Sequence, residues 1–145
     1  MMDRVELAVS LFQKGFSCSQ ALVAAYCECF GLEREVALRV AAGFGGGMGR
    51  MAETCGAVTG AFILIGLKYG SAESKDRQAK ENTYKAVREL AQRFKACHDS
   101  LVCRELLGCD ISTPEGFQHA KEQKLAATVC ATLVRDAAQI VEQII

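Results

Sequence analysis

Hydrophobic residues recur every three or four positions along most of the chain, which is the spacing of one face of an α-helix. The pattern is clearest over residues 3–14, about 74–97 and about 118–145. No segment shows the sustained alternation that is typical of a β-strand. The sequence therefore predicts an all-α fold, with about six to eight helices in a single domain spanning residues 1–145. Two predicted apolar rows are Thr83, Val87, Leu90, Phe94 and Cys97, and Leu125, Val129, Leu133, Ala137, Ile140 and Ile144.

Capping residues indicate where several of these helices begin and end. Ser17 is a candidate N-cap for a helix over residues 18–30, and Gly31 is its stop signal. Thr113 followed by Pro114 is a second start signal, because proline is favoured at the first helical position. Shorter helices are expected over residues 33–42 and 101–107.

The middle of the chain has a different pattern. A glycine-rich stretch at 43–49 precedes an apolar helix over about 53–69, which carries no charge before Lys68. Gly56 and Gly60 lie four residues apart in this helix. A glycine inside a helix costs about 1 kcal/mol relative to alanine, so this pair predicts a backbone or a cofactor in close approach. We expect the helix to be the buried centre of the bundle.

Charge and length exclude several classes of protein. Lysine plus arginine and aspartate plus glutamate both number 17, so the net charge is zero and the basic field of a nucleic-acid-binding protein is absent. The longest uncharged run is too short to cross a bilayer, and the N-terminus lacks the features of a secretory signal. We therefore expect a cytoplasmic protein without membrane insertion.

Two cofactor motifs are absent from the sequence. The glycine-rich stretch GFGGGMG matches neither of the nucleotide-binding motifs GxGxxG and GxxxxGK[ST]. It also follows no predicted strand, so it does not indicate a nucleotide site. Position 94 is phenylalanine, so Cys97 and His98 do not complete a haem-attachment motif.

The eight cysteines are the candidate chemistry of the chain. Disulfides that only stabilise the fold are rare in the cytosol, which favours redox or metal chemistry for some of them and packing for others. Cys55 is the first candidate. It is predicted in the first turn of the apolar helix, with Thr54 as N-cap, where the helix dipole lowers a thiol pKa. The alternative is a small buried residue at a helix contact.

The remaining cysteines and histidines have simpler interpretations. On a helix the side chains of Cys27 and Cys29 would point about 160° apart, so they cannot both bind one metal ion. Both are therefore predicted to be packing residues. Cys97 lies on an apolar row and is predicted in the core, whereas Cys109 is predicted in a loop. His98 and His119 have polar neighbours and are predicted to be solvated.

The cysteine layout resembles the C_GCAxxG_C_C family of redox-active proteins, which four cysteines define. The matching segments are GFSCSQALVAA, FGGGMGRMAETCGAVTG, SLVCRELLGCDISTPEG and ATVCATLVRDAA. They carry Cys18, Cys55, Cys103 and Cys130 respectively. The family label writes Gly before Cys, whereas this chain reads Cys55-Gly56-Ala57-x-x-Gly60.

The resemblance implies a redox role for these four cysteines. They would act either as catalytic thiols centred on Cys55, with an unknown redox partner, or as ligands. Similarity to the iron–sulfur part of split-Soret cytochromes implies the second role, and four cysteines are the number that ligates one [2Fe–2S] cluster. Zinc is an alternative metal for the same four ligands. A further hypothesis is a structural or interaction domain in which the cysteines only pack. The apolar helix would also suit a homodimer interface.

Overall fold

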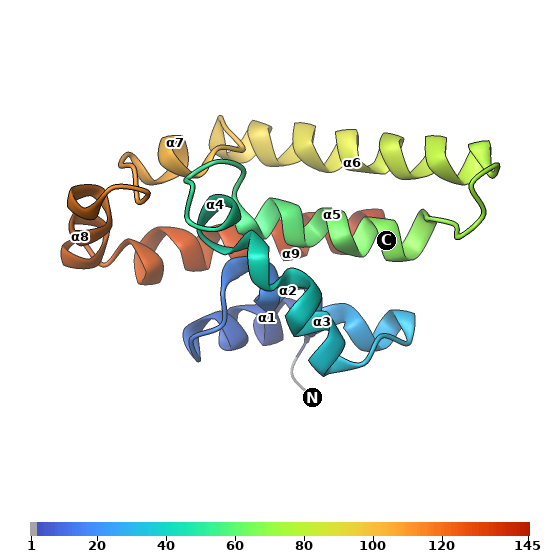
Figure 1. Cartoon of the computed structure of the whole chain (residues 1–145), viewed down its shortest axis with the longest axis horizontal. Helices are drawn as coiled ribbons and strands as arrows, with labels where there is room; N and C mark the ends of the chain where they lie inside the picture. The colour runs from blue at the N-terminus through green and yellow to red at the C-terminus, as the bar shows by residue number, and fades with distance from the viewer. Residues whose placement is uncertain (1–2) are drawn as a thin grey trace.

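The computed structural model, which describes residues 3–145, is built from helices (Figure 1). No strand occurs among these residues, and the only β-type contact is one isolated bridge between Thr54 and Val102. The predicted all-α fold is confirmed. The longer helices are α1 (Arg4–Gln13), α2 (Cys18–Tyr26), α3 (Arg34–Ala41), α5 (Gly56–Tyr69), α6 (Arg77–His98), α8 (Pro114–Glu122) and α9 (Ala131–Ile144). The short elements are η1 (Cys27–Phe30), η2 (Ala42–Phe44), α4 (Gly45–Met48), α7 (Cys103–Leu107) and η3 (Ala126–Cys130).

Helix α5 lies at the centre of the fold and packs against α2, α6 and α9. Figure 1 shows α6 running along one side of α5 and α9, with α1, α2 and α3 on the other side. The first six residues of α5 are all buried, and Leu64 and Ile65 are fully buried further along. The predicted role of this helix as a buried centre is therefore confirmed.

The two glycines in α5 allow α2 to approach closely. A Cβ on Gly60 would lie 2.9 Å from the Cβ of Leu22 and 3.0 Å from the carbonyl oxygen of Ser19, both in α2. A Cβ on Gly56 would lie 3.2 Å from the Cβ of Cys18, the first residue of α2. The close approach predicted from the glycine spacing is thus made by a neighbouring helix.

Both predicted start signals are confirmed. The Ser17 side chain accepts a hydrogen bond from the Gln20 backbone N–H, and the Gln20 side chain accepts one from the Ser17 N–H, which completes a capping box. Thr113 accepts from the Gly116 N–H with Pro114 at the first helical position. Gly31 ends the second helical segment in the left-handed region at φ 67°.

The single C-terminal helix predicted over 118–145 is wrong. Lys124 adopts a left-handed conformation at φ 54°, which ends α8 and prevents a continuous helix. The chain then forms the π-helical turn η3 before α9 begins. π-Helical turns are rare in proteins, and those that do occur are often found at functional sites. Cys130 is the last residue of η3.

The glycine-rich stretch folds into one left-handed turn. Four consecutive residues, 46–49, have φ between 66° and 71°. The Gly49 N–H donates to the Gly45 carbonyl, and the Ala52 and Glu53 N–H groups donate to the carbonyls of Gly46 and Gly47. The left-handed conformation costs each non-glycine residue about 1–2 kcal/mol. Three of the four residues in this turn are glycines, so only Met48 carries that cost.

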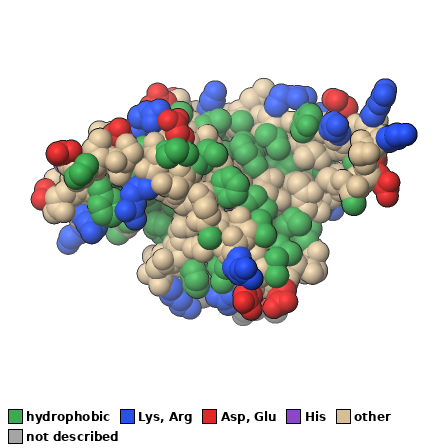
Figure 2. All heavy atoms as spheres, in the orientation of Figure 1, with side chains coloured by type: hydrophobic (Ala, Val, Ile, Leu, Met, Phe, Trp, Pro, Cys, Tyr) green, Lys and Arg blue, Asp and Glu red, His purple; other side chains and the backbone are tan. Residues whose placement is uncertain are grey.

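The surface in Figure 2 carries charges of both signs along its edges. This distribution agrees with the zero net charge of the sequence. Within residues 3–145, every helix falls short of the length or the apolar character that crossing a membrane requires.

Candidate functional site

The four cysteines that the resemblance groups together line one small cavity. Cys18, Cys55, Cys103 and Cys130 all border an enclosed space of about 50 Å³. Glycines of the left-handed turn and aliphatic side chains complete its wall: Gly46, Gly47, Gly56, Leu106, Leu107, Ile111 and Leu133. Four segments that are far apart in the sequence therefore present their thiols to a single apolar space.

A short antiparallel pairing of two chain segments holds Cys55 and Cys103 together. The Cys55 N–H donates to the Leu101 carbonyl at 2.8 Å, and the Cys103 N–H donates to the Glu53 carbonyl. The Arg104 guanidinium fastens the pairing, because it donates to the Ala52 carbonyl at 3.0 Å and forms an ion pair with Glu53 at 3.1 Å. Cys55, the N-cap of α5, and Cys103, the first residue of α7, therefore lie next to each other.

Cys18 and Cys130 reach the cavity from helix ends. The capping box at Ser17 fixes Cys18 as the first residue of α2. The π-helical turn η3 places Cys130 at its junction with α9. Both residues are half-buried, whereas Cys55 and Cys103 are buried.

The left-handed turn packs very closely against Cys103 and the backbone of Ala52 and Glu53. A Cβ on Gly47 would lie 2.7 Å from the Cβ of Cys103 and 2.7 Å from the backbone nitrogen of Glu53. Such contacts are impossible for any side chain, so the left-handed turn can cover the cavity only with glycine at this position.

The two buried thiols remain protonated at neutral pH. Burial raises the pKa of Cys55 to about 11, although the N–H groups of Ala57 and Val58 oppose this rise. Burial also raises the pKa of Cys103 to about 12, with the neighbouring Cys55 and Cys130 sulfurs adding to the rise. The predicted low pKa of Cys55 is wrong because desolvation outweighs the helix N-terminus. Cys55 is itself the N-cap of α5, so Thr54 does not cap this helix.

Cys18 and Cys130 form an interacting pair with opposite pKa shifts. A hydrogen bond from the Cys18 thiol lowers the pKa of Cys130, against the effect of burial. The same bond raises the pKa of Cys18 well above its ordinary value, and burial adds to the rise. The two thiols are therefore coupled, and the Cys18 thiol favours the thiolate form of Cys130.

The four thiols match the donor type and number of an iron–sulfur or zinc site. Their placement does not match, because no three of the Cys, His, Asp or Glu side chains in residues 3–145 are arranged to hold one metal ion. The residues as placed therefore do not fit a closed metal site.

The structure corrects several predictions for the other cysteines and for His98. Cys27 is buried and packs as predicted, but Cys29 and Cys97 are exposed. Cys97 lies near the C-terminal end of α6, where the predicted apolar row leaves the core after Phe94. His98 is not simply solvated, since its Nε2 lies 2.8 Å from an Asp136 carboxylate oxygen. Cys109 is half-buried and His119 is exposed.

Two open grooves meet at Cys130. The first, here called the arginine groove, has a volume of about 540 Å³ and is lined by Cys18, Cys130 and Arg50 among others. The second, called the lysine groove, has a volume of about 390 Å³ and contains Lys121 and Lys124. Both share the side chains of Ile111, Phe117, Ala126 and Cys130. Sequence reasoning did not single out Arg50 or Phe117, because no motif marks them.

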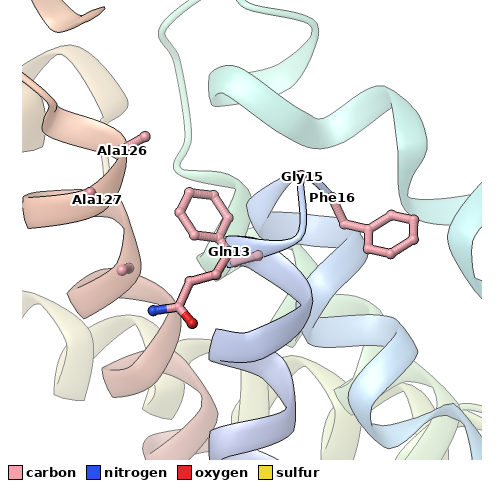
Figure 3. Close-up of a pocket in the computed structure, with 7 residues that line it drawn as sticks. Gln13, Gly15, Phe16, Ala126 and Ala127 are labelled. Carbon is pink, nitrogen blue, oxygen red and sulfur yellow. The ribbon is translucent and has the colours of Figure 1, made fainter.

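A third hollow lies between the end of α1 and η3. Figure 3 shows Gln13 and Gly15 on one side of it and Ala126 and Ala127 on the facing helix. Its volume is about 410 Å³. Neither a cysteine nor any charged side chain lines this hollow, so it offers no group for redox chemistry.

Comparison with known proteins agrees with the geometry of the site. No curated protein and no solved structure is significantly similar to the chain. The family model described as "Putative redox-active protein (C_GCAxxG_C_C)" matches residues 16–144, which includes all four cysteines of the cavity. The chain therefore belongs to the C_GCAxxG_C_C family of putative redox-active proteins.

Proposed function

We propose that the protein is a thiol–disulfide oxidoreductase in which Cys130 is the attacking thiolate and Cys18 the resolving thiol. The observation that carries this proposal is that Cys18 and Cys130 border the same small cavity and also line the open arginine groove, where Cys18 lowers the pKa of Cys130. A thiolate is the nucleophile in disulfide exchange, and a second nearby thiol is required to complete the reaction.

The reaction consists of two balanced exchanges. The Cys130 thiolate attacks one sulfur of a substrate disulfide, so a Cys130–substrate disulfide forms and the other half leaves as a thiolate. Cys18 then transfers its proton to the thiolate that left in the first exchange and attacks the Cys130 sulfur, which releases the second half as a thiolate. Two electrons pass from the protein to the substrate, and a Cys18–Cys130 disulfide remains. A dithiol reductant must restore the pair.

Cys55 and Cys103 have a supporting role in this proposal. Their raised pKa values keep both thiols neutral at pH 7. Neutral sulfurs beside Cys130 avoid the repulsion that further thiolates would add in an apolar cavity. The sequence predicts Cys55 as the centre of the chemistry. The Cys18–Cys130 pair is better supported, because Cys55 is buried whereas Cys18 and Cys130 line the open arginine groove.

A cysteine-ligated iron–sulfur or zinc site is the second candidate. The donor set of four thiols around one cavity favours it, and the arrangement of those thiols counts against it. Metal analysis of anaerobically purified protein separates the two candidates. Stoichiometric iron or zinc would support the second candidate and contradict the thiol mechanism.

The thiol mechanism is tested by the pH dependence of Cys130 alkylation by iodoacetamide. The assay uses a chain in which the accessible Cys29, Cys97 and Cys109 are replaced by serine. We expect a midpoint below the ordinary cysteine value of about 8.5. Cys18→Ala should raise this midpoint, whereas Cys18→Ser should largely preserve it because the hydroxyl group still donates. An ordinary midpoint in all three proteins would contradict the proposal and favour a structural role.

A further inference from the structure

Cys130 is the residue at which the buried cavity and the two open grooves meet. It borders the cavity of the four thiols, the arginine groove and the lysine groove. Cys18 borders the cavity and the arginine groove only. A molecule in the lysine groove can therefore reach Cys130 but not Cys18, whereas one in the arginine groove can reach both. Cys130 is the thiol that both grooves share, as its role of attacking thiolate in the proposed function requires.

Three cations surround the grooves. The guanidinium carbon of Arg50 lies 4.4 Å from the centre of the Phe117 ring, and the Lys121 nitrogen lies 4.6 Å from it. Cation–π contacts of this kind hold a positive charge against an aromatic face. Lys124 also lines the lysine groove. The Phe117 ring thus fixes two positive charges beside the route to Cys130.

These charges are not neutralised by the protein. No aspartate or glutamate lines either groove. Within residues 3–145, Arg50, Lys121 and Lys124 take part in none of the ion pairs. Unpaired cations along a groove with apolar walls attract anions and raise their local concentration.

The size and the lining of the grooves further define the occupant. Volumes of about 540 and 390 Å³ lie in the range of sites for small molecules. Most of the lining is apolar, including Leu107, Ile111, Phe117 and Leu125. A suitable ligand therefore combines an apolar body with a negatively charged group.

We propose that the two grooves are the substrate site of Cys130 and that the substrate is a small disulfide with an apolar body and a carboxylate. This inference rests on the proposed function, and it names the substrate class for the same exchange. The carboxylate is held near Arg50 or Lys121, and the apolar part lies against Phe117. One sulfur of the substrate then reaches the Cys130 thiolate, and the other leaves as a free thiolate.

The test compares two aromatic disulfides on the chain that lacks the accessible Cys29, Cys97 and Cys109. Dithiobis(nitrobenzoate) carries carboxylates, and dithiodipyridine is uncharged. Both release a coloured product, so the rate constant for Cys130 is measured directly and divided by that of a free thiol. We expect Arg50→Gln with Lys121→Gln to slow the carboxylate probe about threefold to tenfold and to leave the uncharged probe unchanged. Added salt should produce the same selective slowing.

Arg88→Gln is the matched control, because Arg88 is exposed on α6 and lines neither groove. It should change neither rate. If both probes react with Cys130 but the double variant slows them equally or not at all, the substrate inference is wrong while the thiol mechanism stands. If Cys130 reacts with neither probe, the proposed function itself fails. If the rates for both probes fall as protein concentration rises, a second copy of the chain covers the grooves, and the substrate inference is overturned.

Discussion

The backbone of Gly47 is packed directly against Cys103, and a Cβ on Gly47 would lie 2.7 Å from the Cβ of that cysteine. Gly47 also has φ of 71°, a conformation that residues with a side chain rarely adopt. We therefore predict that Gly47→Ala destabilises the fold by about 2–5 kcal/mol, through backbone strain and overpacking together. Chemical denaturation measures this loss.

Gly49→Ala is the control for the strain alone. Gly49 has φ of 66°, but the nearest atom to an added Cβ is 3.9 Å away. Its replacement should cost only the strain of about 1–2 kcal/mol. Equal losses for the two variants would show that contact with Cys103 does not constrain the turn.

The glycine pair of α5 gives a second prediction. Gly60→Ala should destabilise the protein by about 1–3 kcal/mol, because the new methyl group would collide with Leu22 and Ser19 of α2. Gly66→Ala in the same helix has open space at its Cβ and should stabilise by about 0.5–1 kcal/mol. Thermal unfolding of the two variants measures the difference. A stabilising Gly60→Ala would contradict the observed packing of α2 on α5.

Stability at alkaline pH depends on the buried thiols. The pKa of Cys55 rises from 9.0 to about 11 on folding, so the folded state favours the neutral form. Its contribution is complete below about pH 9 and is lost as the pH rises towards 11. A shift of this size corresponds to about 2–3 kcal/mol. We predict that Cys55→Ala flattens the fall in the free energy of unfolding over this interval.

The slope against pH distinguishes this effect from a general loss of packing. Cys55→Ala also removes a buried side chain, which lowers the stability equally at every pH. Cys97→Ala, at an exposed position on α6, serves as the control and should keep the slope of the unmodified protein. If Cys55→Ala keeps that slope as well, the ionisation of Cys55 does not limit alkaline stability.

Local signals in the sequence predicted much of the fold. Ser17, Gly31 and Thr113 act locally, through capping bonds and a left-handed stop, and each lies where the sequence predicts. The apolar run of α5 predicted its central position because a helix without a polar face must be buried. The break at Lys124 was missed, since a lysine in the left-handed region carries no local signal.

The roles within the site could not be predicted from spacing. The resemblance grouped the four cysteines, and the structure brings all of them to one cavity. Whether a thiol ionises depends on burial and on its neighbour in space, and both are tertiary properties. Cys55 has the local features of an activated thiol, but its burial reverses their effect. The contact of Cys18 with Cys130 joins the start of α2 to η3, which no local pattern reveals.

The most direct test of the central claim is to identify the first disulfide that forms on mild oxidation. The chain is purified and reduced anaerobically, its iron and zinc are measured, and it is treated with one equivalent of diamide. Mass spectrometry of proteolytic peptides then assigns the linked residues. The account predicts metal-free protein with a Cys18–Cys130 disulfide as the main product. A main product that links Cys55 to Cys103, or stoichiometric metal bound to the four cysteines, would contradict it.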